Sequence, residues 1–499
     1  MHKTKNYMTP KIYNTYMEKN KHQCYNSIVK IQSLSINDKD DKMKKENKMG
    51  VMPVGKLILS MSLPMMLSML VQALYNVVDS IWVAKVSEDA LTAVSLAFPL
   101  QNLMIGVATG TGVGINALLS RSLGAKDYKK VNKVASNGLF LALLSGVLFL
   151  FIGLFAVKPF YMTQLKSSSS PIFAYGVDYL SICCMFSFGV FGQVACERLM
   201  QATGKTTLSM FTQLIGAIVN IILDPFLILG IGFFPRLEAK GAAVATVIGQ
   251  ICACIAGLII NKKFNKEIKV SFKGFRPDKE IIGEIYKIGV PSIIMVGIGS
   301  IMTFLMNKIL LSFTETAAAV FGVYFKLQSF IFMPVFGLNN GVIPIVAFNY
   351  GAQKRGRMIK AVKISAVMAC SIMLFGTFLM WIMPETMLKL FEASENMLML
   401  GVPALRTISL SFPLAGFCIC LGSVFQALGK SHYSMFTSIA RQLIVLIPAA
   451  YLLSKTGNVD NVWYAFPIAE LMSTFCTAIF FTVVYKKVIS KIPNRSDKN

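Results

Sequence analysis

The stretch QATGKTTLSMFT (residues 201–212) returns later in the chain as QALGKSHYSMFT (residues 426–437). Eight of the twelve positions are identical, and the two stretches are 225 residues apart. Two further pairs keep the same order: SLPMM matches GVPSI, and SRSLGAKD matches FNYGAQKR, each with its shared Pro or Gly 227 residues later. Three matching blocks at nearly one offset indicate that the chain consists of two related halves.

The composition points to a membrane protein. The 499 residues are 55% hydrophobic and only 15% charged, with a mean hydropathy of +0.60, whereas soluble domains carry about 25% charged residues. Segments of roughly 20 apolar residues span a bilayer, and nearly charge-free runs occur at 139–156, 218–234, 364–383 and 471–485. We predict an all-α polytopic membrane protein of about 12 transmembrane helices in two six-helix bundles.

Six spans per half is an even number, so both halves enter the membrane from the same side and form parallel repeats. Two such bundles facing each other across a cleft suit alternating access. The expected division is a disordered basic cytoplasmic arm (1–53), an N-terminal six-helix lobe (54–263), a cytoplasmic linker (264–280), a C-terminal six-helix lobe (281–488) and a cytoplasmic tail (489–499).

The formal net charge of +25 follows membrane topology. Lys and Arg gather in the loops that lie an even number of spans along the chain, and such loops stay in the cytoplasm. We therefore expect a multi-pass protein of the cell membrane with both termini cytoplasmic. Membrane lipid is an expected partner, nucleic acid is not, and we expect a monomer.

The repeated GKT and GKS turns could suggest a nucleotide site. A phosphate-binding loop needs a glycine five residues before the GK glycine, and Leu199 and Val424 stand there instead. The three histidines are scattered, so no metal cluster is visible and no enzyme is predicted. We expect no cofactor, and an ion gradient would have to drive any transport.

Acidic and amide groups inside apolar segments are functional hypotheses by default, because a charge at the bilayer centre costs roughly 2.5–3.5 kcal/mol. Asn220 and Asp224 are four residues apart and share a helix face. Asp79, from another helix, could complete a cage of oxygen ligands for Na⁺. Alternatively, two neighbouring carboxylates could bind a proton. Glu197 is a third acid, near the end of its apolar segment.

Architectural roles are the alternative. Asp224 directly precedes Pro225 and could cap a helix that restarts after a kink. Glu197 could pair with Arg198 or Lys205. The repeat argues against a scaffold role, because none of the three acids has an acidic counterpart in the second half; Asp79, Glu197 and Asp224 correspond to Met306, Gly422 and Ala449. This asymmetry favours a coupling site in the N-terminal bundle, with Pro225 as a bending point.

Several stretches together resemble the multidrug and toxic compound extrusion (MATE) family of cation-coupled antiporters. They are LPMMLSMLVQALYNVVDSIWVA, GVGINALLSRSLGAKD, RLMQATGK, NIILDPFLILG, KGAAVATVIGQ, GLNNGVIPIVAFNYGA and FQALGK. The bacterial branch with a glutamate before the QATGK turn is the most similar. The resemblance implies twelve helices in two lobes and export of amphipathic organic cations in exchange for Na⁺ or H⁺.

The same resemblance assigns roles by motif. Asp79 is similar to the first-helix acid, Asn220 and Asp224 to the fifth-helix cation ligands, and Thr246 to the sixth-helix ligand. Asp79, Asn220 and Asp224 would hold Na⁺ if that is the coupling ion. Glu197 is similar to the acid of cation or drug recognition.

Small-molecule drugs and organic cations are the expected substrates, in a cleft lined by aromatic and Met side chains. The candidates are Tyr75, Met104, Tyr324, Phe325, Gln328 and Met333. The alternative function is a lipid-linked oligosaccharide flippase of the same superfamily. That function needs a wide cleft with several arginines, and arginine is sparse in the apolar segments.

Overall fold

The computed structural model describes residues 46–165, 170–232, 234–270, 274–391 and 393–493. Most of the predicted disordered arm, and part of the predicted tail, lie outside the described residues. Residues Lys48–Asn499 form one compact unit, and every described helix belongs to it. The described part of this unit is built from helices and contains no strand.

The first six spans form what we call the N-lobe. A short helix, α2 (Lys48–Val51), precedes them. The helices of the N-lobe are α3 (Val54–Ala84), α4 (Glu88–Gly124), α5 (Tyr128–Phe151), the π-helix η1 (Ile152–Ala156), α6 (Val157–Gln164), α7 (Pro171–Met185), α8 (Phe188–Ala202), α9 (Thr206–Leu229) and α10 (Ala239–Phe264).

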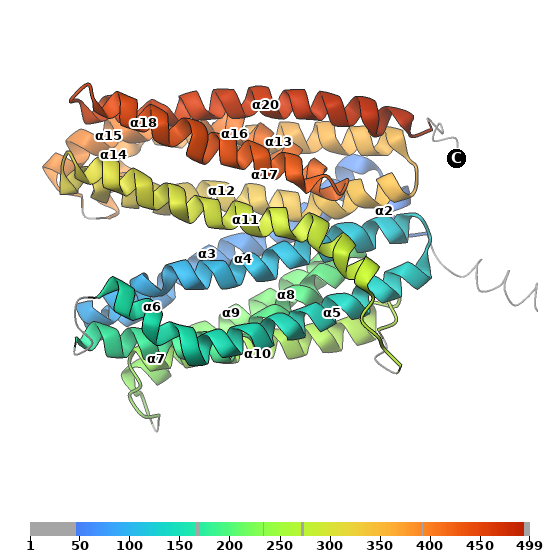
Figure 1. Cartoon of the computed structure of the whole chain (residues 1–499), viewed down its shortest axis with the longest axis horizontal. Helices are drawn as coiled ribbons and strands as arrows, with labels where there is room; N and C mark the ends of the chain where they lie inside the picture. Colours follow the sequence, from blue (N-terminus) through green and yellow to red (C-terminus); the bar gives the residue numbers. More distant parts are fainter. Residues whose placement is uncertain (1–45, 166–169, 233, 271–273, 392, 494–499) are drawn as a thin grey trace, which may run out of the picture. The chain divides into compact units, whose positions relative to one another are not determined.

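The next six spans form what we call the C-lobe. Its helices are α11 (Lys279–Leu311), α12 (Glu315–Gly351), α13 (Arg355–Ile382), α14 (Pro384–Lys389), α15 (Glu395–Ser409), α16 (Phe412–Ala427), α17 (Ser431–Ile439), the π-helix η2 (Ala440–Leu446), α18 (Ile447–Ser454), α19 (Val459–Trp463) and α20 (Ala465–Lys487). A 3₁₀ turn, η3 (Ile489–Lys491), comes after them. In Figure 1 the C-lobe, coloured yellow to red, lies above the N-lobe, coloured mainly blue to green.

Ten of the described helices are long and apolar enough to cross a membrane, and two bent pairs bring the number to as many as twelve. The bent pairs are α7 with α8, at 45°, and α15 with α16, at 46°. Each is the fourth span of its lobe. The all-α polytopic fold of about 12 transmembrane helices is therefore confirmed, and the repeat extends to the bend.

The repeated GK turns connect helices. Gly204 and Gly429 have φ of 85° and 73°, a left-handed conformation that glycine adopts without a Cβ penalty. The amide of the following lysine, Lys205 or Lys430, donates to the carbonyl five residues earlier, at 2.8 and 2.7 Å. These are Schellman-type helix ends, so both turns serve as connections between spans.

The lobes touch through helices that approach at glycines. A Cβ built on Gly124 would lie 2.0 Å from the carbonyl oxygen of Phe348, and one on Gly351 would lie 2.0 Å from that of Arg121. Gly337, against Met66, makes a second close approach, between α12 and α3. All of these contacts lie toward one end of the two lobes, the end at which α2 lies. We call this end of the lobes the basic end.

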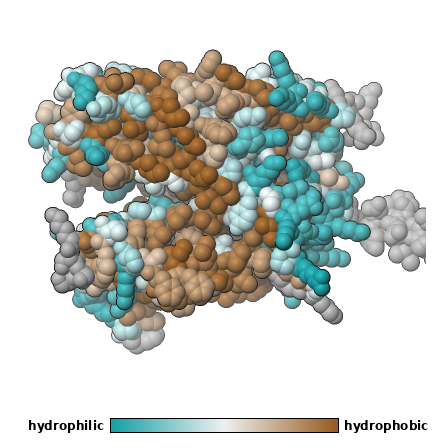
Figure 2. Space-filling view, in the orientation of Figure 1, coloured by the Kyte–Doolittle hydropathy of each residue, from teal (hydrophilic) through white to brown (hydrophobic). Residues whose placement is uncertain are grey.

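Figure 2 shows the polar surface gathered at the basic end, on the right, and a hollow between the lobes at the opposite end, on the left. The lobes are therefore closed against each other at the basic end and open at the opposite end.

Candidate functional site

A polar cavity lies inside the N-lobe, between α3, α4, α8, α9 and α10. About 110 Å³ of it is open to water-sized molecules, which is room for several waters, since one water needs roughly 10–15 Å³ by this measure. Its polar lining consists of Gln72, Tyr75, Thr109, Gln193, Glu197, Arg198, Gln213, Asn220, Thr246 and Gln250. A cluster of amides, acids and hydroxyls in an apolar bundle is suited to a small cation with its waters.

The register of α3 against α9 brings two of the predicted acids together. Ser68 on α3 donates a hydrogen bond to Gln213 on α9, and both helices leave the basic end in the same direction. Asp79 and Asp224 each follow this pair by eleven residues (79 − 68 and 224 − 213), which is about three helical turns. Asp79 is close enough to Asp224 for the two carboxylates to repel each other.

Close packing of α9 on α10 places Thr246 beside the same group. A Cβ on Gly249 would lie 2.7 Å from the carbonyl oxygen of Gly216 and 3.3 Å from the Cβ of Asn220. Asn220 Nδ2 can donate to Asp224 Oδ1 at 3.2 Å and to Thr246 Oγ1 at 3.4 Å. The two glycines thus allow the amide to lie between a carboxylate and a hydroxyl.

Acceptor oxygens remain without a donor at this point. Asp79 Oδ1, Asn220 Oδ1 and Asp224 Oδ2 are buried and have no hydrogen-bond partner. Asp224 is fully buried, and neither it nor Asp79 forms an ion pair with any Lys or Arg in the described ranges. The site therefore collects oxygen ligands from two acids and an amide, and no Lys or Arg of the described ranges is paired with its acids.

The architectural alternative for Asp224 is wrong. Helix α9 begins at Thr206 and continues through Pro225 to Leu229, so Asp224 lies in the helix interior and caps nothing. The helix ends at Gly230, whose φ is 73°. That Pro225 bends the helix during transport stays a prediction.

Glu197 lies at the wall of the same cavity, 8% exposed. It accepts a hydrogen bond from Gln193 Nε2 at 2.9 Å and lies within electrostatic range of Arg198. Lys205, the other predicted partner, instead donates to Phe264 O and Asn265 Oδ1. Tyr75 lines the same cavity as Glu197.

Arg198 links this cavity to the other lobe. Its Nη1 donates to Gln201 Oε1 at 2.8 Å, within α8, and to Asn340 Oδ1 on α12 at 2.9 Å. Arg198 as a whole is 7% exposed, and its side chain packs over Gly112, where a Cβ would lie 2.9 Å from Arg198 Cγ. Asn340 was not predicted, because one amide in an apolar helix does not indicate which helix faces it.

The predicted cleft residues are dispersed. Tyr75 lines the N-lobe cavity, whereas Met104 is 4% exposed in the N-lobe core and Tyr324 is 2% exposed in the C-lobe core. Phe325 packs against that core, and Tyr324 stacks near Phe321 and Phe325. Gln328 and Met333 are half-buried on α12. A role for these residues in substrate binding stays a prediction.

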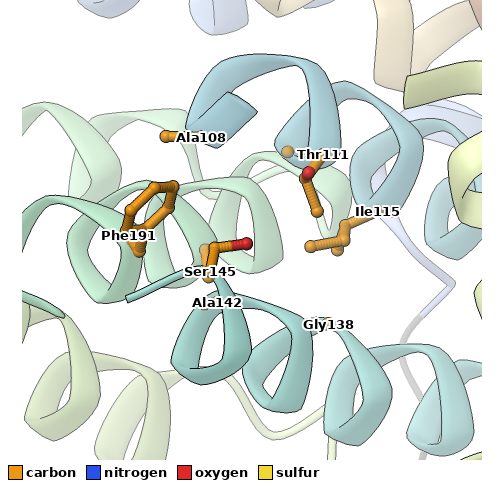
Figure 3. Close-up of a pocket in the computed structure, with 9 residues that line it drawn as sticks. Ala108, Thr111, Ile115, Gly138, Ala142, Ser145 and Phe191 are labelled. Atoms are coloured by element: carbon orange, nitrogen blue, oxygen red, sulfur yellow. The ribbon is translucent and has the colours of Figure 1, made fainter. Parts of the chain in front are cut away.

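A second, smaller pocket lies between α4, α5 and α8 (Figure 3). About 10 Å³ of it is accessible, which is room for about one water. Thr111 and Ser145 face it among small residues, and Thr111 Oγ1 has no hydrogen-bond partner. The pocket is too small for an organic substrate.

Two parallel six-helix lobes, closed at one end and open at the other, with the acids Asp79 and Asp224 brought together inside the N-lobe, define a membrane transporter. The MatE family model matches residues 64–226 and 291–452, one copy in each half. The chain therefore belongs to the MatE family of multidrug efflux transporters.

Relatives and solved structures agree with this assignment. The chain is 28% identical to the multidrug export protein MepA of Staphylococcus haemolyticus over 435 residues, covering 87% of this chain and 93% of MepA. MepA of Staphylococcus aureus is 27% identical over 439 residues, covering 87% and 94%. A solved MATE transporter in its outward-facing conformation superposes with a TM-score of 0.83 at 24% identity, over 90% of this chain and 99% of that one.

Proposed function

We propose that the protein is a secondary multidrug exporter that exchanges organic cationic or amphipathic compounds for Na⁺ or H⁺. The observation that carries this proposal is the set of buried acceptor oxygens on Asp79, Asn220 and Asp224 that lack any donor. A bound cation supplies the positive charge that these oxygens lack, because unpaired buried charge is costly.

Both candidate ions fit the donor set. Na⁺ is a hard cation that favours several oxygen ligands, and Asp79, Asn220, Asp224 and Thr246 offer carboxylate, amide and hydroxyl oxygens. A proton needs only one carboxylate, and adding it removes the repulsion between Asp79 and Asp224. Either ion lowers the cost of keeping the two acids together.

Exchange of the organic cation for the coupling ion follows from the repulsion between these two positive charges. Glu197 and Asn220 line one cavity, and Asn220 donates to Asp224. An organic cation near Glu197 and a coupling ion at Asp224 would therefore repel each other, so each weakens the binding of the other. We assign the basic end to the cytoplasm by the distribution of Lys and Arg. The open end then faces outward, where the coupling ion enters and the organic cation leaves.

The test is efflux of ethidium from proteoliposomes with Na⁺ and H⁺ gradients imposed separately. Asp224→Asn and Asp79→Asn should each abolish stimulation by the coupling ion. Asp89→Asn, an exposed acid in the first turn of α4, is the matched control and should behave as wild type. Normal stimulation in Asp224→Asn would contradict the proposal.

The alternative, a lipid-linked oligosaccharide flippase, needs arginines free to bind phosphate. Arg198 and Arg441 point into the bundles, but Arg198 is bonded to Gln201 and Asn340, and Arg441 is paired with Glu470. This use of both side chains supports the exporter. Scrambling of a lipid-linked oligosaccharide in liposomes, measured with the same preparation, separates the two functions.

A further inference from the structure

The C-lobe contains an ion pair that neither the cleft nor the coupling site uses. Arg441 Nη1 on η2 lies 3.3 Å from Glu470 Oε2 on α20. The Glu470 side chain is 6% exposed and that of Arg441 is 35% exposed. Cys418 on α16 lies beside Glu470 and Thr474, with its Sγ 3.4 Å from Thr474 Oγ1.

The pair stands where the N-lobe has its cavity. The span Ser431–Ser454 repeats the span Thr206–Leu229 at the same length of 24 residues and directly after the same GK turn. At this offset of 225, Arg441 corresponds to Gly216, and Cys418 corresponds to Gln193. Gly216 and Gln193 both line the N-lobe cavity.

The facing helix packs in the same place, with its polar positions shifted by one residue: at the offset of 225, Glu470 corresponds to Ala245, the neighbour of Thr246. Helix α20 packs on α16 and η2, as α10 packs on α8 and α9. In the N-lobe this last helix presents Thr246 and Gln250 to the cavity. In the C-lobe it presents Glu470, with Thr474 one turn later, whose hydroxyl donates to the Glu470 carbonyl at 2.8 Å.

The helix backbone differs between the two lobes at the position of Arg441, whose side chain needs more space than Gly216 does in the N-lobe. At Gly216, helices α9 and α10 are so close that a Cβ would lie 3.1 Å from the carbonyl oxygen of Gly249. In the C-lobe the corresponding turns are wound as the π-helix Ala440–Leu446, a local widening often found at functional sites. Arg441 is its second residue, so the widening coincides with the guanidinium.

We propose that Arg441 is a tethered cation that permanently occupies the C-lobe counterpart of the N-lobe cation cavity, with Glu470 as its carboxylate ligand. The C-lobe therefore takes no exchangeable ion, and coupling is confined to the N-lobe. This second consequence rests on the proposed function, whereas the site itself does not.

The residues around Glu470 predict which class of ligand can replace the Arg441 side chain. Glu470 faces a planar, permanently charged group that carboxylates bind with directional hydrogen bonds. Removal of the Arg441 side chain leaves a buried carboxylate and a space of guanidinium size. The free guanidinium ion should enter that space and restore the pair.

The experiment is thermal unfolding of the purified full-length protein in detergent. Arg441→Gly should lower the Tm, because removal of one partner leaves a buried charge uncompensated. Low-millimolar guanidinium chloride should raise the Tm of Arg441→Gly by several degrees, as a ligand of the native state does. Equal concentrations of NaCl and of urea, which is neutral and of similar shape, are the controls and should have no such effect.

The matched variant is Arg441→Gly combined with Glu470→Gln, which should show no response to guanidinium. An equal response to guanidinium in both variants, or none in Arg441→Gly, would overturn the tethered cation.

If Arg441→Gly cannot be purified, the variant that combines Arg441→Gln with Glu470→Gln decides. This neutral pair should bind the coupling ion with the wild-type stoichiometry in calorimetry, and loss of a bound ion would overturn the proposal. Neither the unfolding experiment nor the calorimetry measures transport. A failure of the tethered-cation proposal can therefore be told apart from a failure of the proposed exporter function.

Discussion

Ser68 donates a hydrogen bond to Gln213, and this pair fixes α3 against α9 three turns before the carboxylates of Asp79 and Asp224. Gln213 also donates to Gln72 Oε1 at 3.0 Å. The side-chain amide of Gln213 thus sets the relative position of Asp79 and Asp224, although its hydrogen bonds go to Ser68 and Gln72.

Gln213→Ala should therefore weaken cation coupling without removing a charge. It breaks two hydrogen bonds, each of which contributes about 1 kcal/mol. We expect the cation concentration for half-maximal efflux to rise roughly tenfold while the maximal rate stays near wild type. Efflux measured across a cation titration checks this, and a fall in the maximal rate alone would indicate a different role for Gln213.

Asn220→Ala tests the amide between Asp224 and Thr246. A hydrogen bond to a charged group contributes about 1.5–3 kcal/mol, so the apparent cation affinity should fall by about 10- to 100-fold. Thr246→Ala should have a smaller effect, because its contact with Asn220 is longer, at 3.4 Å. Thr482→Ala, whose hydroxyl bonds only the carbonyl of Ala478, is the control. Equal effects of all three substitutions would contradict a site centred on Asn220.

Gly124→Ala should disfavour the conformation closed at the basic end. The new Cβ would lie 2.0 Å from the Phe348 carbonyl oxygen, and overpacking costs about 1–3 kcal/mol. Gly356→Ala is the matched control, since nothing lies within 4 Å of its Cβ position and alanine favours the helix by up to about 1 kcal/mol. The two variants should shift the Tm in opposite directions.

Asn340→Ala removes the bond from Arg198 that crosses between the lobes. Gln201→Ala removes a bond from the same guanidinium within the N-lobe. Of these two bonds, only the one to Asn340 joins the lobes. Only Asn340→Ala should therefore increase hydrogen–deuterium exchange on both sides of the interface, in the basic halves of α8 and α12. Equal exchange in the two variants would show that Arg198 stabilises α8 alone.

Asp278 predicts a pH dependence of stability. Its carboxylate accepts a hydrogen bond from Lys133 Nζ at 3.0 Å and from the amides of Ile281 and Glu280, and these bonds lower its pKa. A lowered folded-state pKa gives stability that is complete above the unfolded pKa of about 3.9 and is lost as pH falls through the folded value.

Asp278→Asn should therefore lower the Tm at pH 7, and the difference from wild type should shrink as the pH falls below about 4. Asparagine keeps the helix cap, so the variant isolates the charge. A difference that is constant with pH would assign the effect to the cap.

The sequence was sufficient for the repeat and the number of spans, which depend on periodicity. It singled out Asp79, Asn220 and Asp224 because polar residues are rare in the apolar segments, whereas Thr246 came from the family resemblance alone. The sequence was insufficient for the bend between α7 and α8. Phe186 and Ser187, at that break, include neither Pro nor Gly. Gln193 and Gln213 were also missed, although each is spaced on the face of a predicted site residue, Glu197 and Asn220.

The cleft residues show the limit of reading one helix at a time. Tyr324 and Gln328 are four residues apart on α12, yet Tyr324 is packed among Phe321 and Phe466. Whether an aromatic side chain faces the core of its own lobe or the space between lobes depends on the lobe packing. Hydrophobic pattern does not encode that choice.

The contact between Gly124 and the Phe348 carbonyl lies at the extreme end of α4, a helix of 37 residues and therefore about 55 Å long. Gly106, Gly110 and Gly114, nearer the middle of α4, are also in tight contact with α11 of the C-lobe. Opening of the basic end therefore has to separate this whole row of glycine contacts together, and not a single point.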